Sequence, residues 1–514
     1  MSTTPVSGSR RARRPRGSDP SGTSTARYRR LRNPFQPAQV LSADQVEAIH
    51  AAALTVLAET GMRVLHPEAR SLFSAGGATV DEASEIVRFD PALVTGSVAA
   101  APPSFEMRSR EGNRDVTMGE NSVMFVPVSG PPYTMDLDRG RRPGTMADFD
   151  DFLRLSQVYD VIHSLGSAAE PQDIPLELRH LRMTLSQIQL SDKIPFVYSR
   201  GRAQVADCLE MIRMAAGLDE DSLVSEPRCW TVINTNSPRQ LDLPMCEGII
   251  DFARAGQVLV ITPFTLAGAM APVSLAGALT LQHAEALAGT ALAQMVRPGT
   301  PVVYGAFTSN VDMRSGAPAF GTPEAFKAAV ASGQLARHLG LPWRSSGVNT
   351  SNVPDAQSAY ETMMNLGGAL QGGANMIIHA AGWLESGLSA SFEKFVLDVD
   401  MLQMIAESFQ PLDTSAAEIG LEAIAGVDPG GHFFGTDHTL ERYRSAFYEP
   451  LLFDRSNYES WQESGSLTAL ERANILWKSA LAGFQPPPLD DAVAAQLDDF
   501  VARRTAEGGA LPRS

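Results

Sequence analysis

The fold of this chain is decided by the stretch from Val258-Leu259-Val260-Ile261 to Pro301-Val302-Val303-Tyr304, in which two short apolar runs flank a longer segment. Both runs are continuous and rich in β-branched residues, which is typical of parallel strands buried on both faces of a sheet. The spacing of the two runs is that of a strand followed by a helix. The stretch therefore predicts a βαβ unit.

The same alternation continues outward in both directions. Successive runs start about 30–43 residues apart, which is the length of one βα unit. The further runs are Val161-Ile162, Pro195-Phe196-Val197-Tyr198, Trp230-Thr231-Val232-Ile233, Pro342-Trp343-Arg344 and Met376-Ile377-Ile378. Seven units are visible, and an eighth strand could come from residues 122–128 or from the chain after Ser415. This series predicts an α/β fold of the (β/α)8 TIM-barrel type, with an open doubly wound sheet as the alternative.

A helical extension is expected before the barrel. Ser42 and Gln45 have the spacing of a capping box, and the apolar residues that follow predict a helix that Gly61 terminates. Thr145 is expected to cap a second helix. We therefore divide the chain into a disordered Arg-rich tail, an N-terminal helical and mixed region, the barrel, and a C-terminal tail, which take residues 1–34, 35–158, 159–480 and 481–514.

The overall composition is that of an ordinary globular protein, with 44% hydrophobic and 19% charged residues. No apolar run reaches the roughly 18–20 residues that cross a bilayer, so no membrane segment is expected. Cys208, Cys229 and Cys246 are too few and too scattered for a disulfide framework or a C-x-x-C metal clamp. We interpret them as small buried thiols of a protein in a reducing compartment, the cytoplasm.

The net charge of −16 is distributed unevenly. Residues 1–34 contain nine arginines and one acid, Asp19, which gives +8 and leaves −24 for the rest of the chain. An acidic body repels nucleic acid and membrane phosphates, so neither is expected as a partner. The tail could be a nucleic-acid arm, a transit peptide or a partner contact, but a plain disordered tail is favoured. No apolar segment follows its arginines, which excludes a signal peptide.

In a (β/α)8 barrel the reactive side chains follow the C-terminal ends of the strands. The stretch from Tyr304 to Glu385 contains three such ends in succession, marked by Gly305, Gly347 and Gly382. Glycine permits tight turns and close approach to a ligand, although it could also be ordinary punctuation between strand and loop. We therefore expect the chemistry of the protein on this stretch.

His379 and Trp383 follow the most apolar of these strands, and Glu385 comes directly after them. His379 could act as a base, a ligand or a hydrogen-bond donor, or it could be a satisfied core residue. A carboxylate beside an indole suits a cationic substrate through charge attraction and cation–π contact. The alternative for Glu385 is a place at a helix N-terminus.

Two further clusters are unusually polar. The loop from Asn349 to Gln357 is too polar for a core, so it is solvated or binds something. His432 and His438 lie in a glycine-rich cluster, but their spacing is not that of a helical zinc pair and no partner cysteine is present, so no metal site is expected. Neither a phosphate-binding loop nor a G-x-S-x-G motif occurs in the sequence.

Several stretches together resemble the trimethylamine methyltransferase family over about residues 30–480. No single motif decides the resemblance, but their order and spacing are specific. The stretches are Tyr133-Thr134-Met135-Asp136 with Arg141-Arg142-Pro143, Ala269 to Ala278 running on to Glu285, Tyr304-Gly305 with Asp312-Met313, Asp355-Ala356-Gln357, Gly430-Gly431-His432-Phe433 with His438-Thr439, Pro450 and Trp461.

The resemblance implies a barrel enzyme that passes a methyl group from a methylated amine to the Co(I) of a separate corrinoid-binding protein. Since this chain contains only standard residues, it is similar to the branch without pyrrolysine, which demethylates quaternary amines such as glycine betaine. It implies no metal and no tightly bound cofactor on this chain, because the corrinoid (cobalamin) comes with the partner. A role in one-carbon metabolism like that of methanogenesis and a homo-oligomeric state are also implied.

The resemblance leaves the catalytic residues open and directs the candidates toward substrate binding. A betaine carboxylate would need a donor such as Arg344, Asn349 or His379. Positioning of the activated cation would supply much of the rate. The substrate-binding candidates are Tyr304, Arg344, Asn349, Gln357, His379, Trp383, Glu385, His432 and His438. The alternatives are a corrinoid-independent barrel lyase or hydrolase, and a binding protein for quaternary amines.

Overall fold

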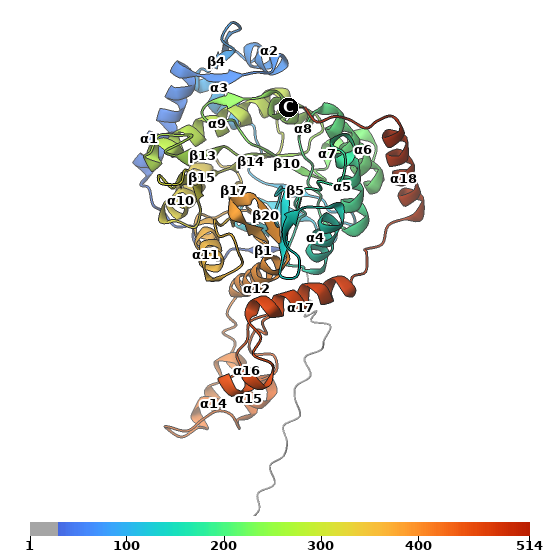
Figure 1. Ribbon diagram of the computed structural model, residues 1–514. Coiled ribbons are helices and arrows are strands. Elements are labelled where there is room, and N and C mark those ends of the chain that lie inside the picture. The colour runs from blue at the N-terminus through green and yellow to red at the C-terminus, as the bar shows by residue number, and fades with distance from the viewer. Residues whose placement is uncertain (1–28, 514) are drawn as a thin grey trace, which may run out of the picture.

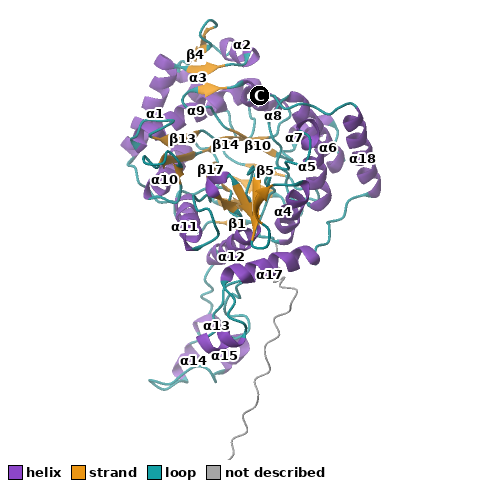
Figure 2. Cartoon of the chain, viewed as in Figure 1, coloured by secondary structure: helices purple, strands orange, loops and turns teal. Residues whose placement is uncertain are grey.

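A computed structural model describes residues 29–513 as an α/β structure in which helices surround a central group of strands (Figure 1). Figure 2 shows most strands gathered in the middle with helices outside them, and the sheet that contains β4 apart from this group at the top. The arginines at positions 10–16 and the predicted disorder of residues 1–28 lie outside the described residues. Among the residues that are described, no helix is long and apolar enough to cross a membrane.

The principal sheet has seven strands, and six of them run parallel. Its order is β1 (Leu31–Arg32), β7 (Ser122–Phe125), β18 (Met376–Ile378), β17 (Trp343–Ser346), β14 (Val302–Gly305), β12 (Val258–Ile261) and β10 (Trp230–Ile233). β7 lies within residues 122–128, one of the two places from which the sequence could supply an additional strand. Five of the seven predicted runs form strands of this sheet.

The other two predicted runs lie between β7 and β10 and make isolated contacts instead of continuous ladders. Single parallel bridges join Ser164 to Ile194 and Phe196 to Trp230. The backbone N–H of His163 donates to the carbonyl of Phe125 at 2.9 Å. A proline at position 195 has no N–H to give to a ladder, which interrupts the regular pairing there. The seven-stranded sheet by itself therefore has two edges, β1 and β10, and is not closed.

Helices cover the outer side of the strands in the order in which the chain visits them (Figure 1). They are α4 (Met146–Val158), α5 (Leu176–Leu190), α6 (Arg202–Ala216), α7 (Glu220–Ser225), α8 (Leu243–Arg254), α9 (Leu275–Val296), α10 (Pro323–His338), α11 (Ala356–Gln371) and α12 (Phe392–Ser408). The cap predicted at Thr145 is present and takes the form of a capping box, because Thr145 and Asp148 exchange hydrogen bonds. The large core between sheet and helices contains alternate strand residues such as Leu259 and Ile261.

The other strand residues form a second, smaller core. Val258 and Val260 of β12 contact residues from β7, β10, β14, β18 and the segment 194–196. The hairpin of β5 (Phe105–Met107) and β6 (Val116–Met118) adds Met107 and Met118 to this cluster. Because the side chains of a strand alternate between faces, the two cores lie on opposite faces of the sheet.

The N-terminal extension has the helix that its capping box predicted. Ser42 and Gln45 exchange hydrogen bonds at the start of α1 (Ala43–Thr55), and the helix continues as one π-turn to Thr60, where Gly61 takes a positive φ of 75°. A four-stranded sheet follows, formed by β2 (Met62–Val64), β4 (Ile86–Arg88), β3 (Thr79–Asp81) and β11 (Gln240–Leu241), with α2 (Pro67–Ala75) and α3 (Pro91–Val98).

Two small sheets extend the chain beyond the C-terminal ends of the principal strands. One consists of β13 (Phe264–Ala267), β15 (Phe307–Val311) and β16 (Pro318–Ala319). The other consists of β19 (Trp383–Leu384), β20 (Ser389–Ser391), β8 (Tyr133–Asp136) and β9 (Gly140–Pro143). β13, β15 and β19 begin two to five residues after the ends of β12, β14 and β18, so the loops at this end are held in sheets.

Both predicted tails contain ordered elements. Residues 29–34 were assigned to the disordered tail, but Leu31–Arg32 form β1 because the buried Leu31 pairs with β7. Residues 481–514 contain α18 (Asp491–Ala506), which packs its apolar side on α5 and α6. Before it, α17 (Ala469–Ala482) packs against α12. Residues 410–466 leave the body between α12 and α17 (Figure 1).

Three histidines join α1 to the helices of the body. His50 Nδ1 lies 2.9 Å from His283 Nε2, and His283 Nδ1 lies 2.9 Å from the Tyr304 hydroxyl. The ring of His338 stacks edge-on against His50 at 4.8 Å. Burial lowers the pKa of His283 to about 3, so this ring stays neutral in the folded protein.

Stability is expected to fall in mild acid because of this pair. Below the ordinary histidine pKa of 6.5, His283 takes up a proton in the unfolded chain but not in the folded protein. The contribution of His283 to the free energy of unfolding is therefore fully present above pH 6.5 and is lost as the pH falls from 6.5 toward 3. We expect about 1.4 kcal/mol less free energy of unfolding at pH 5.5 than at pH 7.5 from His283 alone. Urea titrations at both pH values measure it, and His283→Gln should flatten the dependence. An equal pH effect in the variant would contradict this assignment.

Candidate functional site

The candidate site lies at the C-terminal ends of β14, β17 and β18, where the predicted stretch from Tyr304 to Glu385 comes together. β17 supplies Arg344 from its middle, and β18 is followed directly by His379. Gly382 has a φ of 89°, which a side-chain-bearing residue rarely adopts, and it turns the chain back toward β20. The site is therefore built on strand ends, which hold side chains rigidly.

Arg344 is a buried cation without a carboxylate partner among the described residues. Its side chain is 2% exposed, and it forms no ion pair within 4.0 Å in the described part of the chain. One long hydrogen bond of 3.4 Å reaches the carbonyl of Ala306, and its Nε has no partner within residues 29–513. Burial lowers the pKa of Arg344 to about 9, so the guanidinium is still charged at neutral pH. An unpaired buried charge is costly unless a ligand compensates it.

His379 stands beside this guanidinium and is neutral. Burial and the nearby charge of Arg344 both lower its pKa well below the ordinary value. The residue has a φ of 59°, a strained backbone for a residue with a side chain, and its Nδ1 is buried with no partner within residues 29–513. Such strain concentrates at functional sites. His379 is thus held in place with a free ring nitrogen.

Aromatic rings surround the two polar groups. The Phe307 ring lies 5.4 Å from the guanidinium of Arg344 and 6.2 Å from the ring of His379. Trp383 packs against His379 at 4.0 Å, and its indole N–H has no partner in the described chain. Phe264 and Phe320 flank Phe307 at 5.0 and 5.3 Å. Aromatic faces of this kind attract quaternary ammonium groups.

A buried polar network holds the Trp383 segment from behind. Asn349 donates its side-chain amide to the carbonyl of Trp383 at 2.6 Å and to the Thr362 hydroxyl at 3.3 Å. Lys394 donates to Thr362 at 3.0 Å and forms a buried ion pair with Asp398. Asp398 in turn accepts the backbone N–H of Gly382 at 2.9 Å. These residues position the segment, and Asn349 keeps a buried side-chain oxygen without a partner among residues 29–513.

Three of the sequence-predicted residues lie elsewhere. The hydroxyl of Tyr304 points between sheet and helices, where Gln282 and His283 bind it. Gln357 is exposed and donates to Glu361, whose carboxylate accepts the backbone N–H groups of Thr350 and Ser351. Glu385 pairs with Arg141 at 2.8 Å and accepts from Ser389, so its carboxylate is already engaged. The structure thus brings Arg344, Asn349, His379 and Trp383 together.

The two remaining candidates, His432 and His438, lie on the segment 410–466 that projects from the body. His432 is exposed, and His438 Nε2 is 3.1 Å from the carbonyl of Ala417 in the same segment. Figure 1 places α15 (Asp437–Arg442) far outside the ring of helices around the strands. These histidines therefore do not join the strand-end site in one copy of the chain.

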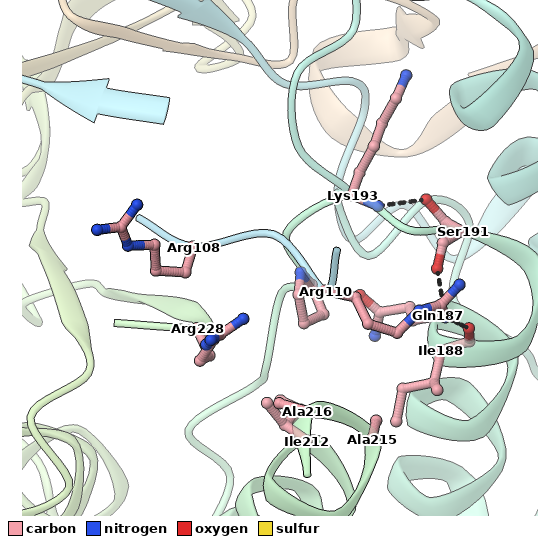
Figure 3. Close-up of a pocket in the computed structure, with 11 residues that line it drawn as sticks. Arg108, Arg110, Gln187, Ile188, Ser191, Lys193, Ile212, Ala215, Ala216 and Arg228 are labelled. Carbon is pink, nitrogen blue, oxygen red and sulfur yellow. Dashed lines mark hydrogen bonds between the residues drawn. The ribbon is translucent and has the colours of Figure 1, made fainter. Parts of the chain in front are cut away.

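A small cavity near the opposite ends of the strands, with several arginines in its lining, has a structural explanation (Figure 3). It measures about 30 Å³, which suffices for a water molecule and is far too small for a substrate. Arg110 donates to the carbonyls of Ile188, Ser191 and Pro488, and Arg108 pairs with Asp115. The arginines here fasten loops to each other and are occupied.

The described chain also offers no alternative metal centre, since no group of three or more His, Cys, Asp or Glu side chains between residues 29 and 513 could hold a metal ion. The three cysteines are free and buried, and burial raises the pKa of each thiol. They are therefore protonated and shielded, and the strand-end site remains the candidate with free, convergent polar groups.

Comparison with known proteins decides the family. The profile of the trimethylamine methyltransferase family matches residues 7–509, nearly the whole chain. The chain belongs to this family. A glycine betaine methyltransferase of Desulfitobacterium hafniense strain Y51 is 36% identical over 472 residues, which cover 91% of this chain and 98% of that protein. A trimethylamine methyltransferase of Desulfitobacterium hafniense strain DCB-2 is 29% identical over 474 residues, covering 91% and 94%.

The family membership confirms the resemblance inferred from the sequence and makes the chain a methyltransferase. Among solved structures, the monomethylamine methyltransferase of Methanosarcina barkeri aligns with 89% of this chain and 92% of its own, at a TM-score of 0.44 and 10% identity. A likeness of this strength places no residue of the site.

Phe307, Lys394 and Asp398 are not among the residues predicted from the sequence. Phe307 follows Gly305 and Ala306 in an ordinary apolar context, so its approach to Arg344 is visible only in three dimensions. Lys394 and Asp398 did leave a signal, because they are charged residues four apart in the segment Phe392–Val399, in which every other residue except Glu393 is apolar. A charge pair on the buried face of a helix indicates an internal ion pair.

Proposed function

We propose that this methyltransferase takes its methyl group from a betaine, a quaternary ammonium that also carries a carboxylate. The observation that supports this most directly is Arg344, a buried guanidinium without a carboxylate partner in residues 29–513, next to aromatic rings. A carboxylate on the substrate would compensate this charge, whereas trimethylamine has none to offer. The 36% identity with a glycine betaine methyltransferase supports the same substrate class.

In this proposal each group around the site has a part in binding. Arg344 holds the carboxylate through its free Nε, and the indole N–H of Trp383 is a second free donor nearby. Phe307 presents its face to the trimethylammonium group. His379 is neutral, so it adds no charge that would repel the ammonium. Removal of a methyl group from a quaternary nitrogen takes no proton from the substrate, and no side chain has to serve as a base.

The acceptor in our proposal is a corrinoid carried by a separate protein. When bound at the mouth of the site, it would supply a strong nucleophile for the methyl carbon. The described residues contribute aromatic and cationic side chains that can hold a substrate. These side chains fit a protein that orients the methyl donor while another protein brings the methyl acceptor. Positioning of the methyl group then supplies much of the rate.

We infer that the strands close into an eight-stranded (β/α)8 barrel around this site. The bridges at Ser164 and Phe196, with the hydrogen bond from His163 to Phe125, connect β10 to β7 through two further extended segments. The second, smaller core combines side chains from β7, β10, β12, β14, β18 and the segment 194–196. In an open sheet, side chains on one face of the outermost strands would be too far apart to share one core. In this barrel β7 would be one of the eight strands, although it belongs to the predicted N-terminal region, residues 35–158.

The proposal is tested with the purified chain, a corrinoid protein reduced to Co(I), and one amine at a time. Corrinoid absorbance should report methylation with glycine betaine and not with trimethylamine at the same concentration. Transfer from trimethylamine alone would overturn the substrate class. Turnover of the betaine without the corrinoid protein would indicate a lyase or hydrolase, and binding without transfer to any corrinoid protein would indicate a binding protein.

Phe307→Ala is expected to weaken the hold on the ammonium group. Loss of one aromatic face in a desolvated site costs about 1–2 kcal/mol, so KM for the betaine should rise roughly 5- to 30-fold. Steady-state transfer rates over a betaine concentration series measure the change. Phe307→Tyr keeps the ring and should stay near the wild type; a rise in KM with tyrosine equal to that with alanine would speak against the cation–π contact.

A further inference from the structure

Residues 410–466 form an arm that projects from the body on the side of α12 and α17 (Figure 1). It contains α13 (Ala416–Ile419), α14 (Leu421–Ala425), α15 and α16 (Tyr458–Glu463). Leu452 is the only one of its residues that is buried, and between residues 410 and 451 there is none. Helices of four to six residues are not stable alone, and a segment without a core cannot offset its own ordering entropy.

The surface of the arm is unusually apolar for a solvent-facing segment. Eleven of the 25 exposed large hydrophobic residues of the described chain lie in these 57 residues. They include Phe434 and Phe447, which are 81% and 80% exposed. At on the order of 100 Å² each, the eleven side chains offer roughly 1,000 Å² of apolar surface, more than monomeric proteins leave uncovered. A stable interface needs about 800 Å² from each partner.

A partner of the arm has to be permanent, because the arm has no core to retain its fold when the partner leaves. A protein that delivers a methyl acceptor must reach the strand-end site and depart again. The arm points outward, away from the strands (Figure 1). A second copy of this chain, by contrast, is always present at equal concentration.

A matching surface exists on the body. α11 has a single charged residue, Glu361, and it is buried, so the outer face of this helix carries no charge. Tyr360, Met363 and Met364 are exposed on that face. Surface helices are normally charged on the outside, so a neutral face of this kind indicates a contact. α11 stands beside α12, from which the arm departs (Figure 1).

The arm also carries a groove that suits these side chains. It has a volume of about 820 Å³ and lies between α13, α14 and α15. The wall from α13 and α14 is rich in small residues, among them Ala417, Gly420 and Ala423, and the wall from α15 carries charged side chains at its rim. Small residues opposite large ones allow two helices to interlock. Two arms facing each other are disfavoured, because each contains ten acidic residues and three basic ones.

We propose that the chain forms a two-fold dimer by exchange of arms, in which the groove of each arm receives the α11 face of the other copy. The contact is reciprocal, as two-fold symmetry requires, and it gives the arm the core that it lacks within one chain. The interface is independent of the substrate proposal, since it uses neither Arg344 nor the residues around it.

Sedimentation of the full chain at micromolar concentration should report a dimer. Tyr360→Glu/Met363→Glu on α11 and Phe434→Asp/Phe447→Asp on the arm should each convert it to a monomer, with the circular dichroism of the body retained. The control Val273→Asp/Leu511→Asp changes residues that are 75% and 74% exposed outside both surfaces, and it should stay dimeric. A monomeric wild type, or arm and α11 variants that remain dimeric, would overturn the proposal.

Crosslinking tests which surfaces meet. The native cysteines of the described chain are buried, so engineered thiols are the reactive ones. A mixture of differently tagged Ala417→Cys and Met363→Cys chains should give a disulfide-linked pair that contains both tags. Ala417→Cys alone should give none. A crosslink of Ala417→Cys with itself would mean that arms pair with arms, and a mixture without any crosslink would mean that the groove does not receive α11; either result contradicts the exchange.

Discussion

Arg344→Gln is expected to reduce kcat/KM for a betaine on the order of 100-fold. The variant leaves the substrate carboxylate buried without a cation, and loss of one member of a buried, charge-assisted pair costs about 3 kcal/mol. Arg344 has no other anionic partner in the described chain that could mask its loss. Transfer rates to a reduced corrinoid protein, measured over a range of betaine concentrations, give the value.

A second variant, Arg344→Met, should be more stable than the wild type in the absence of substrate. Removal of an uncompensated buried charge relieves a desolvation cost, so the free energy of unfolding should rise by about 1–4 kcal/mol in Arg344→Met. Glycine betaine should raise the Tm of the wild type and leave that of the variant unchanged. Arg337→Gln is the control for loss of an arginine outside the site, because Arg337 is exposed, donates to the carbonyl of Gly372 and forms no ion pair within 4.0 Å among residues 29–513. Equal losses of activity in both variants would remove Arg344 from substrate binding.

Asp398→Ala is expected to lower the free energy of unfolding by about 3–5 kcal/mol, because it leaves the buried ammonium of Lys394 without a counter-ion. It also removes the acceptor of the Gly382 N–H, which holds the chain before Trp383. Denaturant titration measures the loss of stability. At temperatures where the variant remains folded, KM for the betaine should rise, since the Trp383 segment loses its support.

A double replacement separates charge from shape at this position. Lys394→Met/Asp398→Leu removes both charges together and should recover most of the stability lost in the single variant, because paired apolar side chains need no desolvation offset. The raised KM should persist, since Gly382 still lacks its acceptor. Asp138→Ala breaks an exposed pair with Lys478 and should leave stability unchanged. If the double variant is as unstable as Asp398→Ala, the cost lies in packing and not in charge.

Local patterns predicted most elements of the fold correctly. The capping residues Ser42 and Thr145 have the roles that their spacing indicated, because a cap depends on residues three positions apart. Five of the seven apolar runs are strands of the principal sheet. The runs at Val161 and Pro195 form only isolated bridges, and Pro195 has no N–H to give to a ladder.

The candidate site was predicted in part. Arg344, Asn349, His379 and Trp383 lie at successive strand ends, and parallel strands bring these ends to one edge. Tyr304 was predicted as a site residue at the end of a neighbouring strand. Its side chain lies instead on the outer face of the sheet, where its hydroxyl hydrogen-bonds to His283. A shift of one residue along a strand reverses the face, and apolar runs without alternation do not reveal which residue points inward.

By itself, the sequence determined the order of strands and helices, the caps, the acidic charge of the body and the strand ends where polar groups collect, because these depend on residues close together in the chain. Only the tertiary structure decided that Arg344 lies buried beside Phe307 without a carboxylate partner in residues 29–513, that Glu385 pairs with Arg141, and that residues 410–466 leave the body as an arm. Burial and pairing depend on which distant segments meet, and no local pattern of residues encodes that meeting.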